Sequence, residues 1–459
     1  MQREDQKQYV SPLGSRYASA AMSYLFSDFH RAKLWRRIWI YLADEQRKLG
    51  LPISKLQVKS LEKNIDRIDL AKVREIENRL KHDVMSHLKA YAMVAKPAEP
   101  ILHLGATSAF VTDNAEALLL KEAVELLQRK ILVILKKLES SILKFASLEM
   151  TGFTHFQPAQ PVTLGKRLGL WAQDLLWDYE ELQIVLDRYV PLGCKGTTGT
   201  QASFMILFKN NYKKVEALDR AVCKRMGFER PVALSGQTLS RKLDVWFLNA
   251  LANFGATASK LSYDMRLLQH TGEVREPFAA EQVGSSAMPY KQNPMLAERI
   301  SGLSRFLMSL AHNATWTHGV QWLERSLDDS SNRRLTIPEA FLTADSVCDS
   351  LYRLVAGFRV DEKLIARNLS KYRPMFETEA AMMEGTLKGE SRQELHERIR
   401  QQSVSGKLEA RVSEWKLSGA AGLQATDFVK KTLRPFITKE AKKFGVSLSD
   451  EGLFKKQSV

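Results

Sequence analysis

The chain has 459 residues, of which 44% are hydrophobic and 26% are charged, and its formal net charge at pH 7 is +16. This composition excludes a disordered or low-complexity chain, and the length allows several domains. Lys and Arg alternate with Asp and Glu along the sequence, so the positive charge does not point to a nucleic-acid partner. The three cysteines lie far apart, which predicts neither a disulfide framework nor a metal site.

The first residues, "MQREDQKQYVSPLG", mix both charges and lack the apolar stretch of a signal peptide. No window of the chain holds the roughly 18 uninterrupted apolar residues that a membrane span needs. We therefore expect a cytoplasmic protein that has no membrane partner. Shorter helical patterns fill the N-terminal part, and they predict a helical domain over residues 1–107.

A stretch without Gly or Pro begins at Asp113 and continues to Gly152. Leu120 and Val124 open a stripe of apolar residues that recurs every three or four positions, which is the period of one helix face. Asp113 or Asn114 would cap the start of this helix, and Gly152 would end it. The pattern predicts a helix about three times as long as the average globular helix.

Four further helices with apolar stripes are expected over residues 163–190, 237–271, 295–318 and 336–357. Five long helices predict an elongated antiparallel bundle, and oligomerisation would cover the apolar stripes that such a rod exposes. No run of alternating strand-like residues occurs, so the predicted fold class is all-α. We expect the bundle domain over residues 108–360 and a smaller helical C-terminal domain over residues 361–459.

The connection over residues 272–294 is long for a compact helical protein. It holds two hydroxyl groups, on Ser285 and Ser286, and one cation, on Lys291. A connection of this length without secondary structure is more often a lid or a binding segment than a spacer. A surface turn rich in Ser, Gly and Pro is the alternative, and this segment alone does not decide between the two.

A second connection, "GFTHFQPAQPVTLGKR", joins two of the predicted helices and places His155 between Phe153 and Phe156. A histidine at such a position can act as a general acid or base near neutral pH. Taken alone, a histidine between two aromatic residues is more often packed and hydrogen-bonded than catalytic.

The segments "RLKHDVMSH" and "ILHLGATSAFVTDN" add His82, His103, Thr107 and Ser108. His82 and His87 are five residues apart, which does not place them on one helix face, and no HExxH spacing occurs. We therefore expect no metal site in these segments.

A fourth segment, "VQWLERSLDDSSNRRLTIPEA", brings Arg325, Ser330, Arg333 and Arg334 together just before the expected start of a helix that contains proline. Arginine and serine at such a place suit a phosphate or a carboxylate ligand. The neighbouring acidic pair at residues 328–329 favours the alternative of a surface ion-pair cluster.

The segment "GSSAMPYKQNP" over residues 284–294 resembles the signature GSSxMPxKxNP of the fumarase/aspartase superfamily and matches it at every fixed position. Further segments resemble the adenylosuccinate lyase family, and its eukaryotic-type branch in particular. They are "SPLGSRYAS", "KHDVMSH", "HLGATSAFVTDN", "GFTHFQPAQPVTLGKR", "KGTTGTQASF", "SGQTLSRKLD" and "QWLERSLDDSSNRR". The resemblance spans nearly the whole chain.

The resemblance implies an all-α protomer with three domains, whose central bundle forms the core of a homotetramer. Each active site would be assembled from three subunits. The implied reaction is β-elimination of fumarate in purine nucleotide biosynthesis. Adenylosuccinate would give AMP, and succinylaminoimidazole carboxamide ribotide would give AICAR, with no metal or organic cofactor.

By the same resemblance, Ser285 is the general base and His155 is the general acid. Lys291 and the start of the helix near Met295 would supply positive charge to the base, and Glu298 would orient His155 or Lys291. His82 belongs to the same catalytic set. The implied substrate contacts are Arg16, Tyr17, Lys81, Asp83, His103, Thr107, Ser108, Thr154, Gln237, Ser286, Asn293, Arg299, Arg325, Ser330 and Arg334.

Two positions depart from many members of the family. Lys81 stands where many have Arg, which keeps the charge but loses the two-pronged donor, and Gln292 stands where many have Arg or His. Other lyases of the superfamily, a non-catalytic helical scaffold and a basic RNA-binding protein are the alternatives. Arg16, Tyr17, Ser330 and Arg334 speak against another lyase, Ser285 and His155 against a scaffold, and the scattered charge against RNA binding.

Overall fold

A computed structural model describes residues 9–408, 415–445 and 453–454. The N-terminal part consists of short helices followed by one longer helix and a further series of short ones. These elements are η2 (Leu13–Tyr17), α1 (Ala20–Leu25), α2 (Asp28–Lys48), α3 (Lys55–Lys63), α4 (Leu70–Leu80), α5 (Asp83–Val94) and η3 (Lys96–Ile101).

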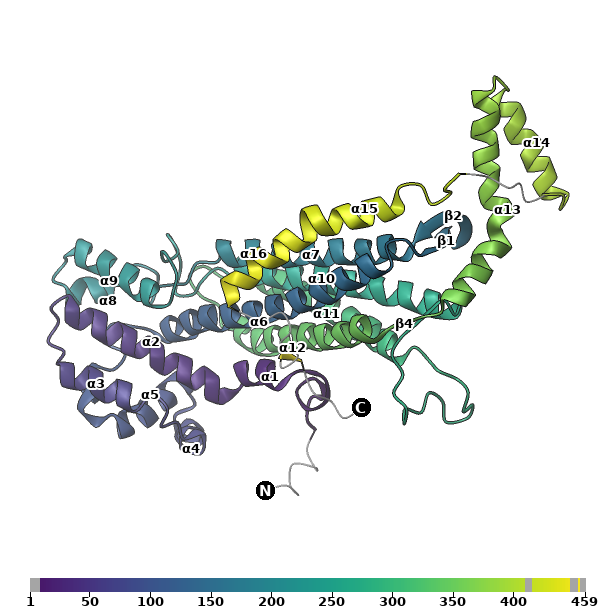
Figure 1. The fold of residues 1–459 in the computed structure, drawn as a ribbon. Coiled ribbons are helices and arrows are strands. Elements are labelled where there is room, and N and C mark those ends of the chain that lie inside the picture. The colour runs from purple at the N-terminus through teal and green to yellow at the C-terminus, as the bar shows by residue number, and fades with distance from the viewer. Residues whose placement is uncertain (1–8, 409–414, 446–452, 455–459) are drawn as a thin grey trace.

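Five long helices run side by side in the centre of the molecule (Figure 1). They are α6 (Ser108–Lys144), α7 (Leu164–Arg188), α10 (Lys242–His270), α11 (Met295–Gly319) and α12 (Asp328–Gly357). Their apolar stripes meet in one core, in which Ile131, Trp171, Phe254 and Phe341 are buried. The five-helix bundle and the all-α class expected from the periodicity are confirmed.

Shorter elements connect these helices and follow them. They are β1 (Glu149–Thr154), β2 (Gln157–Thr163), α8 (Ala202–Leu207), α9 (Tyr212–Arg225), β3 (Val274–Arg275), β4 (Arg359–Val360), α13 (Glu362–Leu387), α14 (Arg392–Val404), α15 (Ala421–Phe428), η4 (Val429–Leu433) and α16 (Arg434–Phe444). Helices α13 and α14 project from one end of the bundle, whereas α15 and α16 return along α6 and α7 (Figure 1). We keep the division at residues 107 and 360 as a proposal.

Both expected ends of the longest helix are wrong. Helix α6 begins at Ser108 after Thr107, and Asp113 lies inside it, where its buried carboxylate accepts the Leu239 N–H. The helix ends at Lys144, and Gly152 lies in strand β1. A β-carbon on Gly152 would come within 2.3 Å of the Gln160 carbonyl oxygen on β2, so this glycine permits close strand pairing and does not stop a helix.

The expected helices over 163–190 and 295–318 match α7 and α11 to within a few residues. Helix α12, however, begins at Asp328 rather than at residue 336. Pro338 therefore lies in the helix interior, where it leaves the Arg334 carbonyl without its helical donor. Helix α10 begins at Lys242 rather than at residue 237, because the backbone of Gln237 is bonded to Glu324 instead.

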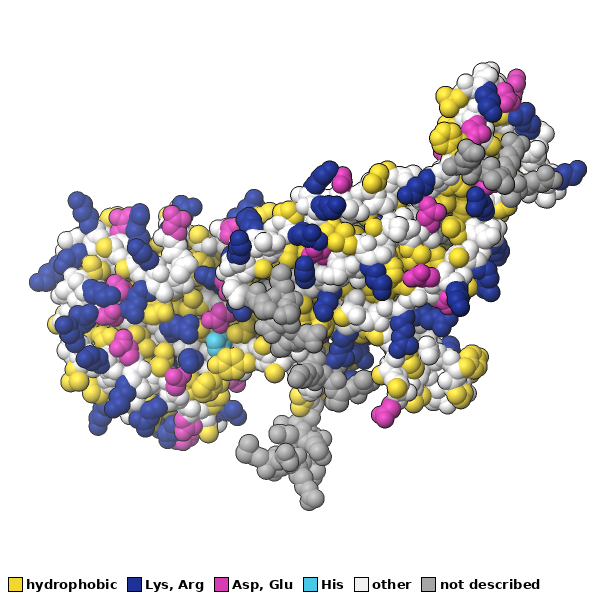
Figure 2. Space-filling model, viewed as in Figure 1, with side chains coloured by type: hydrophobic (Ala, Val, Ile, Leu, Met, Phe, Trp, Pro, Cys, Tyr) yellow, Lys and Arg dark blue, Asp and Glu magenta, His cyan; other side chains and the backbone are white. Residues whose placement is uncertain are grey.

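Two connections that were expected to be loops contain strands. Strands β1 and β2 form an antiparallel hairpin between α6 and α7, and β3 pairs antiparallel with β4 at one end of the 272–294 connection. In the described part of the chain, no helix is both long and apolar enough to cross a membrane. Lys and Arg are spread among Asp and Glu over the face shown in Figure 2.

Candidate active site

A cavity of about 1090 Å³ lies between the N-terminal helices and one end of the bundle. Its walls come from α2, the junction of α4 and α5, the first turns of α6 and α12, and the segment before α10. Eight of the predicted site residues line it: Lys81, His82, Asp83, Ser108, Gln237, Arg325, Ser330 and Arg334. Four separate sequence segments thus supply predicted residues to one cavity.

The junction of α4 and α5 is shaped by Lys81, which ends α4 in the left-handed conformation with φ 54°. His82 then caps α5, because its Nδ1 accepts the Met85 N–H at 3.4 Å. Asp83 follows in the first turn, and its carboxylate lies 2.6 Å from the Arg334 guanidinium of α12. Burial would raise the pKa of Asp83, but the hydrogen bonds from Arg334 and the Val84 N–H hold it below its usual value.

His103 and Thr107 lie near the start of α6 and are not among the residues that line the cavity. Trp39 donates its indole N–H to Nδ1 of His103 at 2.9 Å. Burial, together with the nearby His82, lowers the pKa of His103 to about 4. His103 is therefore a neutral hydrogen-bond acceptor for Trp39 near pH 7.

Three loops are stacked against one another at the cavity wall. The backbone N–H of Gln237 donates to the Glu324 carbonyl at 2.9 Å, and its side chain donates to the Thr197 carbonyl at 3.1 Å. A β-carbon on Gly199 would come within 1.9 Å of the Ser235 carbonyl oxygen. Thr197 was not predicted as a support of Gln237, although the two glycines of "KGTTGTQASF" were a usable signal.

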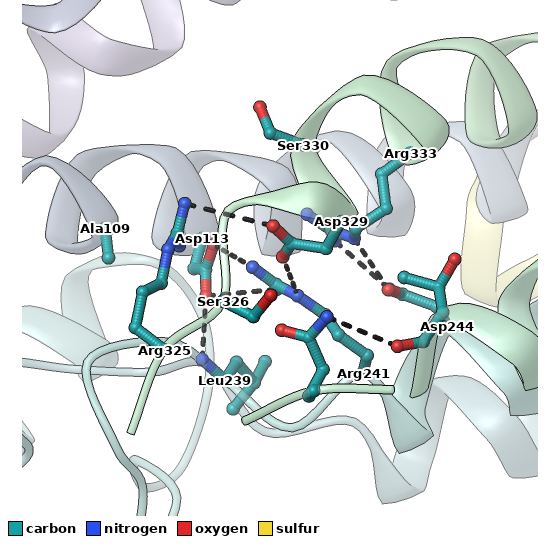
Figure 3. A network of polar contacts seen from close by, with 12 residues as sticks. Ala109, Asp113, Leu239, Arg241, Asp244, Arg325, Ser326, Asp329, Ser330 and Arg333 are labelled. Atoms are coloured by element: carbon teal, nitrogen blue, oxygen red, sulfur yellow. Dashed lines mark hydrogen bonds and ion pairs between the residues drawn. The ribbon is translucent and has the colours of Figure 1, made fainter. Parts of the chain in front are cut away.

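A buried network of charges forms part of the same wall (Figure 3). Arg241 bonds Asp113 and Asp329, and all three side chains are buried. A surface ion-pair cluster at residues 328–329 was the alternative, and it is wrong for Asp329, whose carboxylate is buried in the first turn of α12. Sequence reasoning missed Arg241, because a single arginine in "SGQTLSRKLD" carries no sign of burial.

Arg333 was expected to face a ligand with its neighbours. Its guanidinium instead pairs with Asp244, at 2.7 Å, and with Glu116. The attraction of these carboxylates outweighs the cost of burial and raises the pKa of Arg333 well above its usual value. Arg333 therefore has a structural role, and its charge is already matched.

Three further predicted substrate contacts do not line this cavity: Arg16, Tyr17 and Arg299. The guanidinium carbons of Arg16 and Arg299 are each 5.9 Å from the centre of the Tyr17 ring. Tyr17 and Arg299 line a small hollow beside Ser346 of α12. Ser330 lies 16 residues earlier in the same helix, which corresponds to about 24 Å along its axis. This group is thus separate from the cavity within one copy of the chain.

The serine-containing connection is folded back on itself. Ser285 Oγ accepts the N–H groups of Ala287 and Met288 at 3.3 and 3.1 Å. Asn293 donates to the Gly284 carbonyl at 2.8 Å. A β-carbon on Gly284 would come within 2.1 Å of the Lys291 carbonyl oxygen, so only glycine fits there. Two backbone donors on one hydroxyl oxygen would stabilise its alkoxide form.

Backbone N–H groups at the start of α11 already have an acceptor within the chain. The Glu276 carboxylate accepts the N–H groups of Leu296 and Ala297, each at 2.9 Å, and burial raises the pKa of this carboxyl. The positive charge that we expected from this helix end is thus opposed by Glu276. Lys291 and Ser286 are exposed in the connection, and Glu298 is exposed in the first turn of α11.

Thr154 and His155 stand at the tip of the β1–β2 hairpin and are exposed. His155 and Phe156 have φ values of 51° and 57°, a pair typical of a type I′ turn that usually needs Asn or Gly. The alternative of a packed histidine is therefore wrong. Residues held in this region of backbone space are found preferentially at functional sites.

Comparisons with known proteins identify the class. Residues 54–308 match the sequence model of the family described as lyase. The chain also resembles the crystal structure of 3-carboxy-cis,cis-muconate lactonizing enzyme from Pseudomonas putida. The TM-score is 0.76 at 23% identity, and the match covers 95% of this chain and 99% of that one. The fold and the family match place this chain among the lyases of the fumarase/aspartase superfamily.

Two relatives narrow the class further. The adenylosuccinate lyase of Schizosaccharomyces pombe is 45% identical over 86% of this chain and 83% of its own. The adenylosuccinate lyase of Saccharomyces cerevisiae is 44% identical over 86% and 83%, respectively. The chain therefore belongs to the adenylosuccinate lyase family, and it is a lyase enzyme of purine nucleotide biosynthesis.

Proposed function

We propose that the chain cleaves adenylosuccinate to AMP and fumarate, and succinylaminoimidazole carboxamide ribotide to AICAR and fumarate. The observation that carries this proposal is the meeting of Lys81, Ser108, Gln237, Arg325 and Arg334 at one cavity. The substrates bear a phosphate and two carboxylates, about four negative charges near neutral pH. Arginine and lysine side chains around a cavity suit such a ligand.

The chemistry requires a base, a stabilised carbanion and an acid. In the proposed mechanism, Ser285 as an alkoxide removes a proton from the carbon next to a carboxylate of the succinyl group. The electron pair is delocalised into that carboxylate, whose charge Lys291 offsets. The carbon–nitrogen bond then breaks, the electron pair leaves with nitrogen, and His155 protonates it. The Ala287 and Met288 N–H groups support the alkoxide of Ser285.

The active site is proposed to be shared between copies of the chain in a homotetramer. His155 follows α6 at one end of the bundle and Ser108 begins α6 at the other, so the 37 residues of this helix, about 55 Å, lie between them (Figure 1). One copy cannot bring both to one substrate. Leu170, Trp177 and Ile184 recur every seven residues on α7 and are about half exposed, which supports burial of this face by another copy.

The other proposed contacts fit the same scheme. Arg16, Tyr17 and Arg299 would come from one copy, and Ser286 and Asn293, with Ser285, from another. Thr154 would accompany His155. His82, Asp83 and Ser330 line the cavity itself. His103 and Thr107 are proposed to contact the substrate from the segment before α6. Glu298 is proposed to orient His155 or Lys291, and the cytoplasmic location expected from the sequence stays a prediction.

The purified protein should release fumarate from adenylosuccinate with loss of the substrate's absorbance. Turnover of argininosuccinate or malate, together with none of the nucleotide, would refute the assignment. The shared site is tested by mixing His155→Asn, whose kcat should be low, with Arg334→Ala, whose KM should be high, and by assaying at a substrate concentration well below the KM of Arg334→Ala. Mixed tetramers should recover part of the activity because some sites then contain neither substitution. No recovery in mixed tetramers, or a monomer by mass in solution, would refute the sharing.

A further inference from the structure

The buried carboxylate of Asp329 lies between a buried arginine, Arg241, and a partly exposed one, Arg325 (Figure 3). Its Oδ2 accepts Nε of Arg241 at 2.6 Å. Its Oδ1 lies 3.9 Å from the guanidinium of Arg325, which is within ion-pair range but beyond hydrogen-bond range. The Asp329 side chain is 1% exposed, whereas that of Arg325 is 26% exposed and lines the cavity.

The first arginine holds the carboxylate in place. Arg241 also bonds Asp113 through its guanidinium at 3.2 Å, and Asp113 accepts the Leu239 N–H at 2.7 Å. The side chains of Arg241, Asp113 and Asp329 are no more than 3% exposed. Because both ends of Arg241 are fixed, the Asp329 carboxylate has little freedom to rotate, and Oδ1 stays directed toward Arg325.

The second arginine, Arg325, is attracted by the charge of Asp329 but forms no hydrogen bond with it. Oδ1 of Asp329 is buried and accepts no hydrogen bond within the part of the chain that the structure describes. Arg325 is therefore held over the cavity by charge alone, and it would have to move only about 1 Å to form a hydrogen bond with Asp329. An anion in the cavity can then bind Arg325 without first breaking a hydrogen bond of that arginine to Asp329.

We propose that Asp329 is a positioning residue, which keeps the Arg325 guanidinium directed into the cavity and ready for the anionic group of the substrate. Arg241 acts with it by fixing the carboxylate. This inference rests on the proposed function, since it assigns Arg325 to substrate binding. Asp329 also lines the cavity, but it is not proposed to touch the substrate, because its carboxylate is only 1% exposed and is already bonded to Arg241.

The test is a double-mutant cycle on KM and kcat for adenylosuccinate with Asp329→Asn, Arg325→Gln and the double variant. The amide keeps the size of Asp329 but loses its charge. We expect KM to rise about tenfold in each single variant and kcat to change less than about threefold. The double variant should be no worse than Arg325→Gln alone, because both act through one guanidinium. If the KM increases of the two single variants multiply in the double variant, the proposal is overturned.

Asp328→Asn is the matched control, because Asp328 is the preceding carboxylate in the same helix turn and is exposed. It should leave KM unchanged. An Asp329→Asn variant that behaves like this control would also overturn the proposal. An inactive wild-type protein would instead refute the proposed function, so the two failures are distinguishable.

Loss of the Asp329 charge could prevent folding, because it leaves Arg241 partly unpaired in the interior. Arg241→Lys is the second variant, since it keeps the buried positive charge but cannot bridge Asp113 and Asp329 as Arg241 does. Arg241→Lys should raise KM in an otherwise wild-type protein. Combined with Arg325→Gln, it should raise KM little further. A less stable Arg241→Lys protein with unchanged KM would overturn the proposal.

Discussion

The Arg334 guanidinium of α12 lies 2.6 Å from the Asp83 carboxylate at the start of α5. This ion pair joins the bundle to the N-terminal helices across the cavity that both residues line. An anionic group of the substrate that binds Arg334 would share its guanidinium with the Asp83 carboxylate. The pair therefore sets how much of the positive charge of Arg334 is open to the ligand.

Replacing Arg334 should weaken substrate binding more than it slows the chemical step. Arg334→Ala removes a binding interaction that ground state and transition state share, so we expect KM to rise at least about tenfold with little change in kcat. Steady-state kinetics with adenylosuccinate measure both constants. Arg220→Ala is the control, because Arg220 forms a similar ion pair with Glu216 on helix α9 and does not line the cavity. A fall in kcat at unchanged KM would contradict the assigned role.

Replacing His155 by asparagine should remove the proposed acid and keep the hairpin. Asparagine tolerates the positive φ of 51° at this position better than most residues, so the turn should persist. We expect kcat to fall at least about 10²-fold in His155→Asn. Phe156→Asn changes the other turn residue and should retain kcat within about threefold. Equal losses in both variants would mean that the turn, and not the imidazole, is what matters.

Removal of the Ser285 hydroxyl should abolish the proposed base. Ser285→Ala leaves Ser286 and Asn293 in the same connection, so KM should change less than kcat, which we expect to fall at least about 10²-fold. Single-turnover measurements with excess enzyme would show whether the chemical step itself has slowed. Near-normal turnover in Ser285→Ala would show that another group removes the proton.

His103 should make the folded protein sensitive to acid. Its pKa is about 4 in the folded chain, below the value of about 6.5 in an unfolded chain. Between these values the unfolded state binds the proton more tightly. The contribution of His103 is therefore complete above about pH 6.5 and is lost as the pH falls toward 4, by at most about 3 kcal/mol.

Urea unfolding at pH 7.5 and pH 4.5 tests this contribution. His103→Asn keeps an acceptor for Trp39 and tolerates the φ of 65°, but it does not titrate. The variant should lose less free energy of unfolding between the two pH values than the wild type. His87, whose pKa burial lowers to about 4, should preserve part of the slope in both proteins. Identical slopes would contradict the role of His103.

Local sequence patterns were sufficient to predict the long helices, but they did not predict where two of these helices begin. The apolar period of α6 was visible from Leu120 onward, but the helix begins at Ser108 because Asp113 is held by Arg241 and the Leu239 N–H. Helix α12 likewise begins ten residues before Pro338, and Asp329 in its first turn is buried and bonded to Arg241. Contacts between distant segments decided both ends, and a periodicity read within one segment cannot contain them.

The sequence by itself determined the all-α class, the bundle and the residues of the motif segments, since periodicity and spacing are local properties. Only the tertiary structure decided which of these residues meet. It brings Arg334 to Asp83 and Gln237 to Thr197, it occupies Arg333 with Asp244 and Glu116, and it separates Ser108 from His155 by the length of α6. Burial and long-range pairing depend on the packing of whole helices against one another, and for that reason no single segment could reveal them.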